Sequence, residues 1–209
     1  MTTKKKGRPK ASDAGVFEEK LLACATDLFM RQGYGGTSIS QILSVSDCGK
    51  SAFYRRFGDK ESLFSAVVQR SIRTIFIELG EIPTCDSLND CLQDVGERLA
   101  LGMLAERCIA FIRITAAEAL NFPLLAQKAY QSSLAGSVDY VASALKTFLE
   151  SHNDERLREI AIRFCKLVIQ PLCFQAAFGC IPENPKEYIR DHVSDVIILL
   201  NAKGLTNCL

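Results

Sequence analysis

Apolar residues recur every three or four positions along most of this chain, which is the spacing of a helix that packs one face inward. The first such run covers residues 14–32 and ends at the segment Gly-Tyr-Gly-Gly, because glycine is favoured just beyond a helix end. Two short runs follow, residues 39–45 and 50–57. A fourth run, which Asp59 is expected to cap, reaches about Leu79.

Beyond Pro83 and a polar break, the chain is predicted to form longer helices. Pro123 suits a first helical position, and Pro171 is expected to kink the helix that contains it. No segment is convincing as a strand, so we predict an all-α fold with about nine helices. The five predicted after the break cover residues 88–105, 106–120, 123–151, a stretch that follows a cap cluster at 151–154 and ends near 178, and 188–202.

The two short runs flank Ser46-Asp47-Cys48-Gly49, whose residues favour turns and caps over helix interiors. This pattern predicts helix, tight turn, helix. The second short helix places an apolar edge opposite a set of hydrogen-bond donors that suit phosphates and base edges. The edge is formed by Ala52, Phe53 and Phe57, and the donors are Lys50, Ser51, Tyr54, Arg55 and Arg56.

Charge is divided unequally along the 209 residues. Residues 1–60 hold 11 Lys and Arg against 6 Asp and Glu, a net charge of +5, whereas residues 61–209 hold 14 against 18, a net charge of −4. The basic end is therefore expected to bind nucleic acid. Residues 1–12 are predicted to be a disordered basic arm that follows phosphates or enters a minor groove, and a solubilising tail is the alternative. Its basic residues are Lys4, Lys5, Lys6, Arg8 and Lys10.

The region around the turn resembles the tetracycline-repressor-like (TetR) family of transcriptional regulators. The matching positions are Thr37, Ile42, Phe53, Tyr54, Phe57, Lys60 and Glu61, at the family spacing without a gap. The resemblance covers roughly residues 14–66, and the rest is similar in helical layout to the AefR-like branch. It implies a DNA-binding repressor that is a homodimer, binds an inverted-repeat operator and is released by a small, lipophilic or aromatic effector.

The resemblance also implies roles for particular residues. Thr37, Tyr54 and Lys60 are expected to hold phosphates, and Thr37 is also expected to cap the second helix. We expect Lys50, Ser51, Ala52 and Arg55 to face the groove. The turn departs from the usual Ala-Gly-Val-Ser, but Asp47 tolerates a left-handed backbone, Cys48 can fill a small apolar slot and Gly49 is an acceptable N-cap.

Residues 67–209 are predicted to form an effector-binding and dimerisation domain that follows a helix-turn-helix domain of residues 13–66. Two-sided apolarity of the last two helices favours a dimer interface there. An apolar pocket is expected near residues 72–76, at the far end of the fourth helix, with Arg113 or Glu118 orienting a polar group; an ordinary helical core is the alternative. The predicted lining residues are Phe111, Glu118, Phe122, Phe174 and Phe178.

Other chemistry finds little support. The two histidines, His152 and His192, stand in no catalytic motif, and no Cys and His are spaced as metal ligands, so we expect no enzyme, cofactor or metal site; a small-molecule-handling helical enzyme is the alternative. The nine cysteines are scattered, and most are expected to be buried in a protein of a reducing compartment. A thiol-sensing regulator using Cys48 or Cys85 is a further alternative. With neither a signal peptide nor a membrane span in the pattern, a cytoplasmic location is expected.

Overall fold

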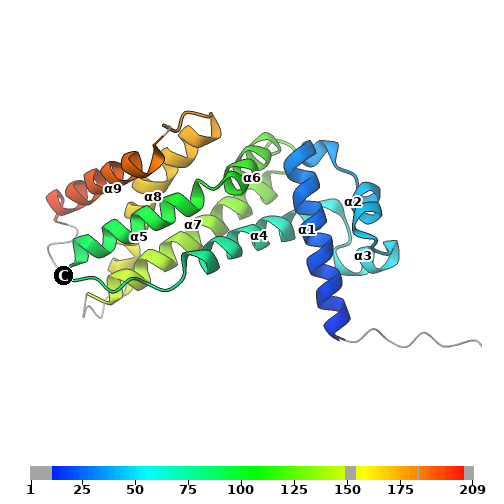
Figure 1. Ribbon diagram of the computed structural model, residues 1–209, viewed down its shortest axis with the longest axis horizontal. Helices are drawn as coiled ribbons and strands as arrows, with labels where there is room; N and C mark the ends of the chain where they lie inside the picture. Colours follow the sequence, from blue (N-terminus) through cyan, green and yellow to red (C-terminus); the bar gives the residue numbers. More distant parts are fainter. Residues whose placement is uncertain (1–10, 149–153, 183, 205–209) are drawn as a thin grey trace, which may run out of the picture. The chain divides into compact units, whose positions relative to one another are not determined.

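A computed structural model of the protein describes residues 11–148, 154–182 and 184–204. These ranges contain nine α-helices and no strand, so the predicted all-α class is confirmed (Figure 1). Contacts divide the chain into two compact units, Met1–Val68 and Gln69–Leu209. The basic arm, with Lys4, Lys5, Lys6, Arg8 and Lys10, lies outside the described residues.

The first unit contains α1 (Ala11–Gly36), α2 (Ile39–Ser46), α3 (Lys50–Arg56) and the start of α4 (Lys60–Leu79). The helical path of α1 breaks at Gly33, whose φ of 73° favours glycine. Phe64 of α4 makes edge contacts, with ring centroids 5.0 Å apart, to both Phe29 and Tyr34. These three rings anchor a small core that holds α2 and α3 against α1. The other fully enclosed side chains are Leu21, Ala25, Ile42, Phe53, Leu63 and Val67.

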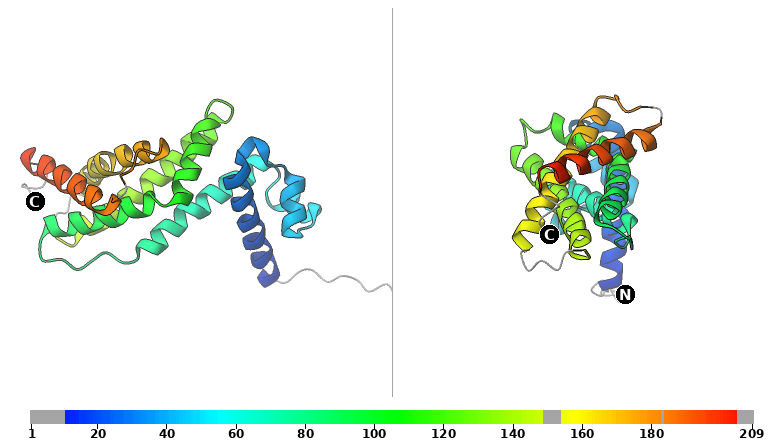
Figure 2. Two further views of the ribbon diagram at one scale, coloured as in Figure 1. Left: turned by 45° about the horizontal axis from the view of Figure 1, so that its top comes forward. Right: turned by 90° about the vertical axis from the view of Figure 1, so that its left-hand side faces the viewer.

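The second unit is a helical bundle in which α5 contacts α6, α7, α8 and α9 (Figures 1 and 2). Its core includes Leu92, Leu99, Leu145 and Phe164, which are all fully buried. The bundle packs closely, because a Cβ added at Gly96 would lie 2.7 Å from Val193 Cγ1 and 2.9 Å from Phe164 Cζ. The helices of this unit are α5 (Leu88–Met103), α6 (Glu106–Ala117), α7 (Pro123–Lys146), α8 (Asp154–Ala177) and α9 (Pro185–Ala202).

Several helix ends differ from the sequence prediction. Helix α6 stops at Ala117 rather than near Leu120, because Glu118 becomes its C-cap and its carbonyl accepts turn hydrogen bonds from the N–H groups of Asn121 and Phe122. Helix α7 ends at Lys146, and most of the predicted cap cluster lies outside the described residues. Helix α9 begins earlier, with Pro185 in its first turn, where the missing N–H costs nothing.

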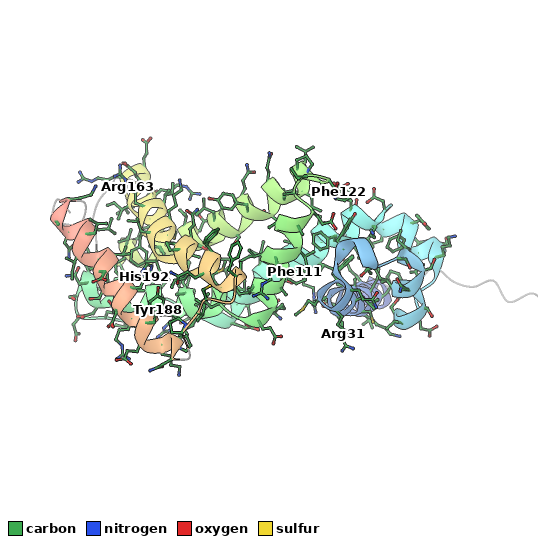
Figure 3. The ribbon with its side chains drawn as sticks, turned by 90° about the horizontal axis from the view of Figure 1, so that it is seen from above. Arg31, Phe111, Phe122, Arg163, Tyr188 and His192 are labelled. Carbon is green, nitrogen blue, oxygen red and sulfur yellow. The ribbon has the colours of Figure 1, made fainter. Side chains whose placement is uncertain are left out.

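Helix α8 runs through Pro171, which has no N–H to donate to the carbonyl of Leu167 four residues earlier. His192 of α9 replaces that donor, since its Nε2 lies 3.1 Å from the Leu167 oxygen and 3.2 Å from the Val168 oxygen. The tautomer with the proton on Nε2 follows from these two acceptors. His192 (labelled in Figure 3) therefore ties α9 to α8.

By length and composition, α8 is also apolar enough to cross a membrane, although 44% of its most apolar window is buried inside the protein. A core helix passes the same test. Leu157, Phe164 and Leu172 pack into the bundle core, which accounts for the apolarity of α8.

Candidate nucleic-acid interface and body pocket

The turn between α2 and α3 has the conformation expected from its residues. Asp47 adopts the left-handed region, with φ 52° and ψ 38°, and closes α2. Gly49 is the N-cap of α3, as predicted. Cys48 is half-buried, and its Sγ lies 3.5 Å from the carbonyl oxygen of Ser46. This short turn fixes where α3 starts and therefore which of its residues face outward.

The prediction that Thr37 caps α2 is wrong. Ser38 is the N-cap, and it forms a reciprocal capping box: its Oγ accepts from the Gln41 N–H, while Gln41 Oε1 accepts from the Ser38 N–H at 2.8 Å. Thr37 lies one residue earlier and is 1% exposed. Its hydroxyl donates to the Gly33 carbonyl at 2.8 Å, so the side chain joins the start of α2 to the kink in α1.

Helix α3 separates apolar and polar residues as its sequence predicts. Phe53 is fully buried, whereas Tyr54 is 46% exposed. Lys50, Ser51 and Arg55 are exposed, and Ala52 is half-buried. Lys50 Nζ lies 5.9 Å from the centre of the Tyr54 ring, so an amine and a phenol share one outward face.

Arg56 differs from the other donors of α3 because it is already paired. Its Nε and Nη2 donate to the two carboxylate oxygens of Glu18 on α1, at 2.7 and 2.6 Å. This two-point contact raises the pKa of the Arg56 guanidinium. Spacing alone cannot reveal a pairing across 38 positions. Arg56 thus orients α3 on α1 rather than pointing freely outward.

Lys60 is likewise engaged within the first unit. Its Nζ donates to the carbonyl oxygens of Tyr34 and Thr37, at 3.0 and 3.1 Å, and lies 4.2 Å from the centre of the Tyr34 ring. Next to it, Asp59 caps α4 by accepting from the Ser62 N–H at 2.7 Å, as predicted. That bond lowers the pKa of the Asp59 carboxyl. The start of α4 is thereby tied to the end of α1.

Two family models match these two units. Residues 21–67 match the bacterial regulatory proteins of the tetR family, and residues 90–202 match the C-terminal domain of AefR-like transcriptional repressors. The second match covers more than half of the chain. The protein is a member of the TetR family. TetR-family proteins are DNA-binding transcriptional regulators and not enzymes, which confirms the predicted class.

Curated relatives match only part of the chain. The transcriptional repressor BdcR of Escherichia coli K12 is 28% identical over 46% of this chain and 49% of its own length. The regulator LmrA of Bacillus subtilis 168 is 46% identical over 23% of this chain and 27% of its own length. The chain thus spans half or less of the length of these relatives.

Solved structures share the TetR fold over nearly the whole chain. A TetR-family regulator from Mesorhizobium loti MAFF303099 has a TM-score of 0.72 at 21% identity, covering 90% of this chain and 97% of that one. The flavonoid-responsive regulator FrrA has a TM-score of 0.71 at 24% identity, with the same coverage. At these identities the likeness concerns the fold.

In the second unit of this TetR-family protein, an open pocket of about 380 Å³ lies between the far end of α4 and the second half of α5. Ile75 and Leu79 supply apolar surface, and Glu78 and Arg98 supply charge. At Gly102 the backbone of α5 comes close to α4, since an added Cβ would meet Ile75 at 3.3 Å. This pocket therefore combines apolar walls with opposite charges.

The five residues predicted to line a pocket are not brought together around this one. Phe111 of α6 is buried, and Phe122, which follows α6, is half-buried (both labelled in Figure 3). Glu118 accepts from the side-chain amide of Asn121 at 3.2 Å. Phe174 and Phe178 are 67% and 71% exposed, with ring centroids 4.9 Å apart on the outer face of α8.

Arg113 has a structural partner that the sequence did not reveal. Its Nε donates to the Ala177 carbonyl at 2.7 Å, and its Nη2 donates to the Ala176 carbonyl at 2.9 Å. These are among the last carbonyls of α8, at the negative end of the helix dipole, and the Ala176 oxygen also accepts a turn bond from the Gly179 N–H at 3.0 Å. The predicted role in orienting an effector would have to compete with this cap.

Within the described ranges, no group of three or more His, Cys, Asp and Glu side chains is arranged to hold a metal ion.

Proposed function

We propose that this TetR-family protein is a cytoplasmic repressor that binds an inverted-repeat DNA operator as a homodimer and releases it when a small, lipophilic or aromatic effector binds. The observation that carries the proposal is the outward face of α3, where Lys50, Ser51 and Arg55 are exposed opposite the buried Phe53. A short helix anchored by its apolar side and presenting donors outward is suited to the major groove.

On this proposal, Lys50, Ser51, Ala52 and Arg55 face base edges. Tyr54 reaches a phosphate with its exposed hydroxyl. The basic arm, with Lys4, Lys5, Lys6, Arg8 and Lys10, contributes phosphate or minor-groove contacts.

The phosphate contacts proposed for Thr37 and Lys60 have a structural condition. Both side chains already bond to backbone carbonyls, so each would have to share its donor with the DNA. A lysine amine has three donors and can do so, whereas the Thr37 hydroxyl has one.

The proposed dimer pairs α8 and α9 with their copies across a two-fold axis. Leu167 and Phe174 lie at positions i and i+7 on one side of α8, Phe178 follows the end of that helix, and all three are exposed. On α9, Ile198 and Leu199 are 62% and 42% exposed. Large apolar side chains on two adjacent helices are favourable to bury in a second copy. A two-fold dimer then implies half-sites about one helical turn, roughly 34 Å, apart or somewhat more.

The proposed effector site uses the apolar interior of the second unit. The pocket bordered by Ile75, Leu79 and Arg98 is a first location, since it touches the far end of α4, the helix that continues from the first unit. Phe111, Glu118 and Phe122 do not border this pocket and remain proposed lining residues of a second location, whereas Phe174 and Phe178 belong to the proposed dimer face. The relative named for its response to flavonoids, FrrA, fits an aromatic effector, although the likeness to it is one of fold.

Gel shifts of the purified protein with the DNA upstream of its own gene, at two salt concentrations, test the proposal. Arg55→Ala should weaken specific binding by about 1–3 kcal/mol and relax base preference at one position. Arg73→Ala is the matched control, because it removes the same charge from an exposed site on α4 in the second unit, outside the proposed dimer helices. The absence of a shift at either salt, or equal losses for both variants, would refute the proposal.

A further inference from the structure

Two cysteine thiols meet where the chain passes from α4 to α5. Cys85 lies in the irregular segment of residues 80–87 and is half-buried, with its Sγ 3.8 Å from the Pro83 carbonyl oxygen. Cys91 lies on the first turns of α5 and is 1% exposed. Cys85 packs on the core cluster that contains Cys91, and the two thiols lie close enough to interact electrostatically.

The two thiols differ in reactivity. Burial, with Cys85 as the next cause, raises the pKa of Cys91 to about 12, so Cys91 stays protonated at neutral pH. The half-exposed Cys85 is therefore the thiol that a solvent oxidant meets first. Because residues 80–87 form no helix, Cys85 can approach Cys91 until the sulfurs reach the bond length of about 2.05 Å.

We propose that Cys85 and Cys91 form a reversible intramolecular disulfide in response to a peroxide, which gives the proposed repressor a second signal besides its effector. The Cys85 thiolate attacks the peroxide O–O bond, becomes a sulfenic acid and releases hydroxide, or an alkoxide from an organic peroxide. The Cys91 sulfur then attacks the sulfenic sulfur, the S–S bond forms, and the hydroxyl leaves as water with the Cys91 proton. Two thiols are oxidised and one peroxide is reduced.

The position of the pair gives the disulfide a consequence. One turn after Cys91, Asp94 accepts from Arg98 Nε at 2.9 Å, and Arg98 borders the pocket together with Leu79 at the end of α4. A disulfide would shorten the connection between α4 and α5 beside this pocket. The regulatory effect rests on the proposed function; formation of the disulfide does not.

Four other cysteines differ from Cys85 in pKa or in exposure. Burial raises the pKa of Cys165 and of Cys173 to about 12, and it also raises the pKa of Cys108. Cys180 is exposed, but its Sγ contacts the carbonyl oxygen of Phe178 at 3.7 Å. It therefore provides a matched control for a thiol that can be oxidised without a partner.

Peptide mass spectrometry tests the disulfide directly. Trypsin releases Cys85 and Cys91 in one peptide, residues 74–98, because that stretch contains no internal Lys or Arg. After the full-length reduced protein is treated with hydrogen peroxide and alkylated, this peptide should appear unalkylated and lighter by two hydrogens, and dithiothreitol should restore both alkylation sites. Alkylation of both thiols, or a sulfinic acid on Cys85 with Cys91 alkylated, would overturn the proposal.

Variants connect the disulfide to regulation. Peroxide should weaken operator binding several-fold in the wild type and in Cys180→Ser, reversibly, and have no effect in Cys85→Ser or Cys91→Ala. Cys85→Ser keeps the test valid if the buried substitution at Cys91 impairs folding. A disulfide that leaves operator affinity unchanged overturns the signalling role. A reduced protein that binds no operator refutes the proposed function instead, while the mass measurement still decides whether the disulfide forms.

Discussion

Gly136 allows α7 to approach the ring of Phe76 on α4 within the second unit. A Cβ at position 136 would clash with Phe76 Cε2 and lie 2.7 Å from Cζ. Carbon atoms pack favourably at about 3.5–4.0 Å, so the ring must move if Gly136 becomes alanine. Phe76 is half-buried against the core cluster, and a ring that swings outward loses that contact.

Two effects of Gly136→Ala oppose each other. Alanine stabilises a helix interior by about 1 kcal/mol over glycine. Overpacking costs about 1–3 kcal/mol, and two contacts this short place the cost near the upper end. We therefore expect Gly136→Ala to lower the free energy of unfolding by about 2 kcal/mol, measured by urea titration with circular dichroism at fixed protein concentration.

Gly15→Ala in α1 is the matched control, because a Cβ there meets nothing within 4 Å. It should raise stability by roughly 0.5–1 kcal/mol. Phe76→Leu removes the ring, so in a double-mutant cycle with Gly136→Ala it should recover about 1–2 kcal/mol. If Gly136→Ala stabilises the protein as Gly15→Ala does, or if the cycle shows no coupling, the close approach of Gly136 to Phe76 does not limit the size of the side chain at position 136.

Further substitutions test three single contacts. The cap bonds lower the pKa of Asp59, so its ionised form stabilises the fold above the ordinary pKa of about 3.9, and that stability is lost as pH falls through the folded pKa. When the pH is lowered below about 4, the melting temperature of Asp59→Asn should therefore fall less than that of the wild type. Arg113→Ala, which uncaps α8, should cost about 1–2 kcal/mol in urea unfolding, and a loss within error would exclude the cap. His192→Ala should cost about 1–2 kcal/mol, and Pro171→Ala in that background should restore part of it by returning a helical donor; no restoration would count against the carbonyl contact.

Local chemistry was sufficient to predict much of the helix-turn-helix. Asp47 in the left-handed region, Gly49 as N-cap and Asp59 as the cap of α4 all follow from the preferences of single residues. Thr37 and Ser38 are both good caps, however, and the choice between them depends on the Thr37 hydroxyl turning back to a carbonyl of α1. Preferences cannot rank two neighbours when a tertiary contact decides.

The body was predicted less well because its sites depend on pairs far apart in sequence. Apolar residues occur around much of α8, so periodicity could not show that Phe174 and Phe178 are exposed while Leu172 is buried. Arg113 was expected to orient a polar group of an effector, yet it donates to carbonyls 63 and 64 positions away. Helix content is encoded locally, whereas pocket lining is set by the way α5 to α9 pack.

The bare backbone at Gly96 limits which movements the bundle can make. Val193 and Phe164 both rest on that one position of α5. Turning α5 by one residue, or sliding it along its axis, would drive the side chain of Val95 or Glu97 into the space that Gly96 leaves empty. Helix α5 can therefore neither rotate nor slide where it crosses α8 and α9. Any signal that reaches the body has to be carried by elements that contact α5 elsewhere, such as the segment that precedes it.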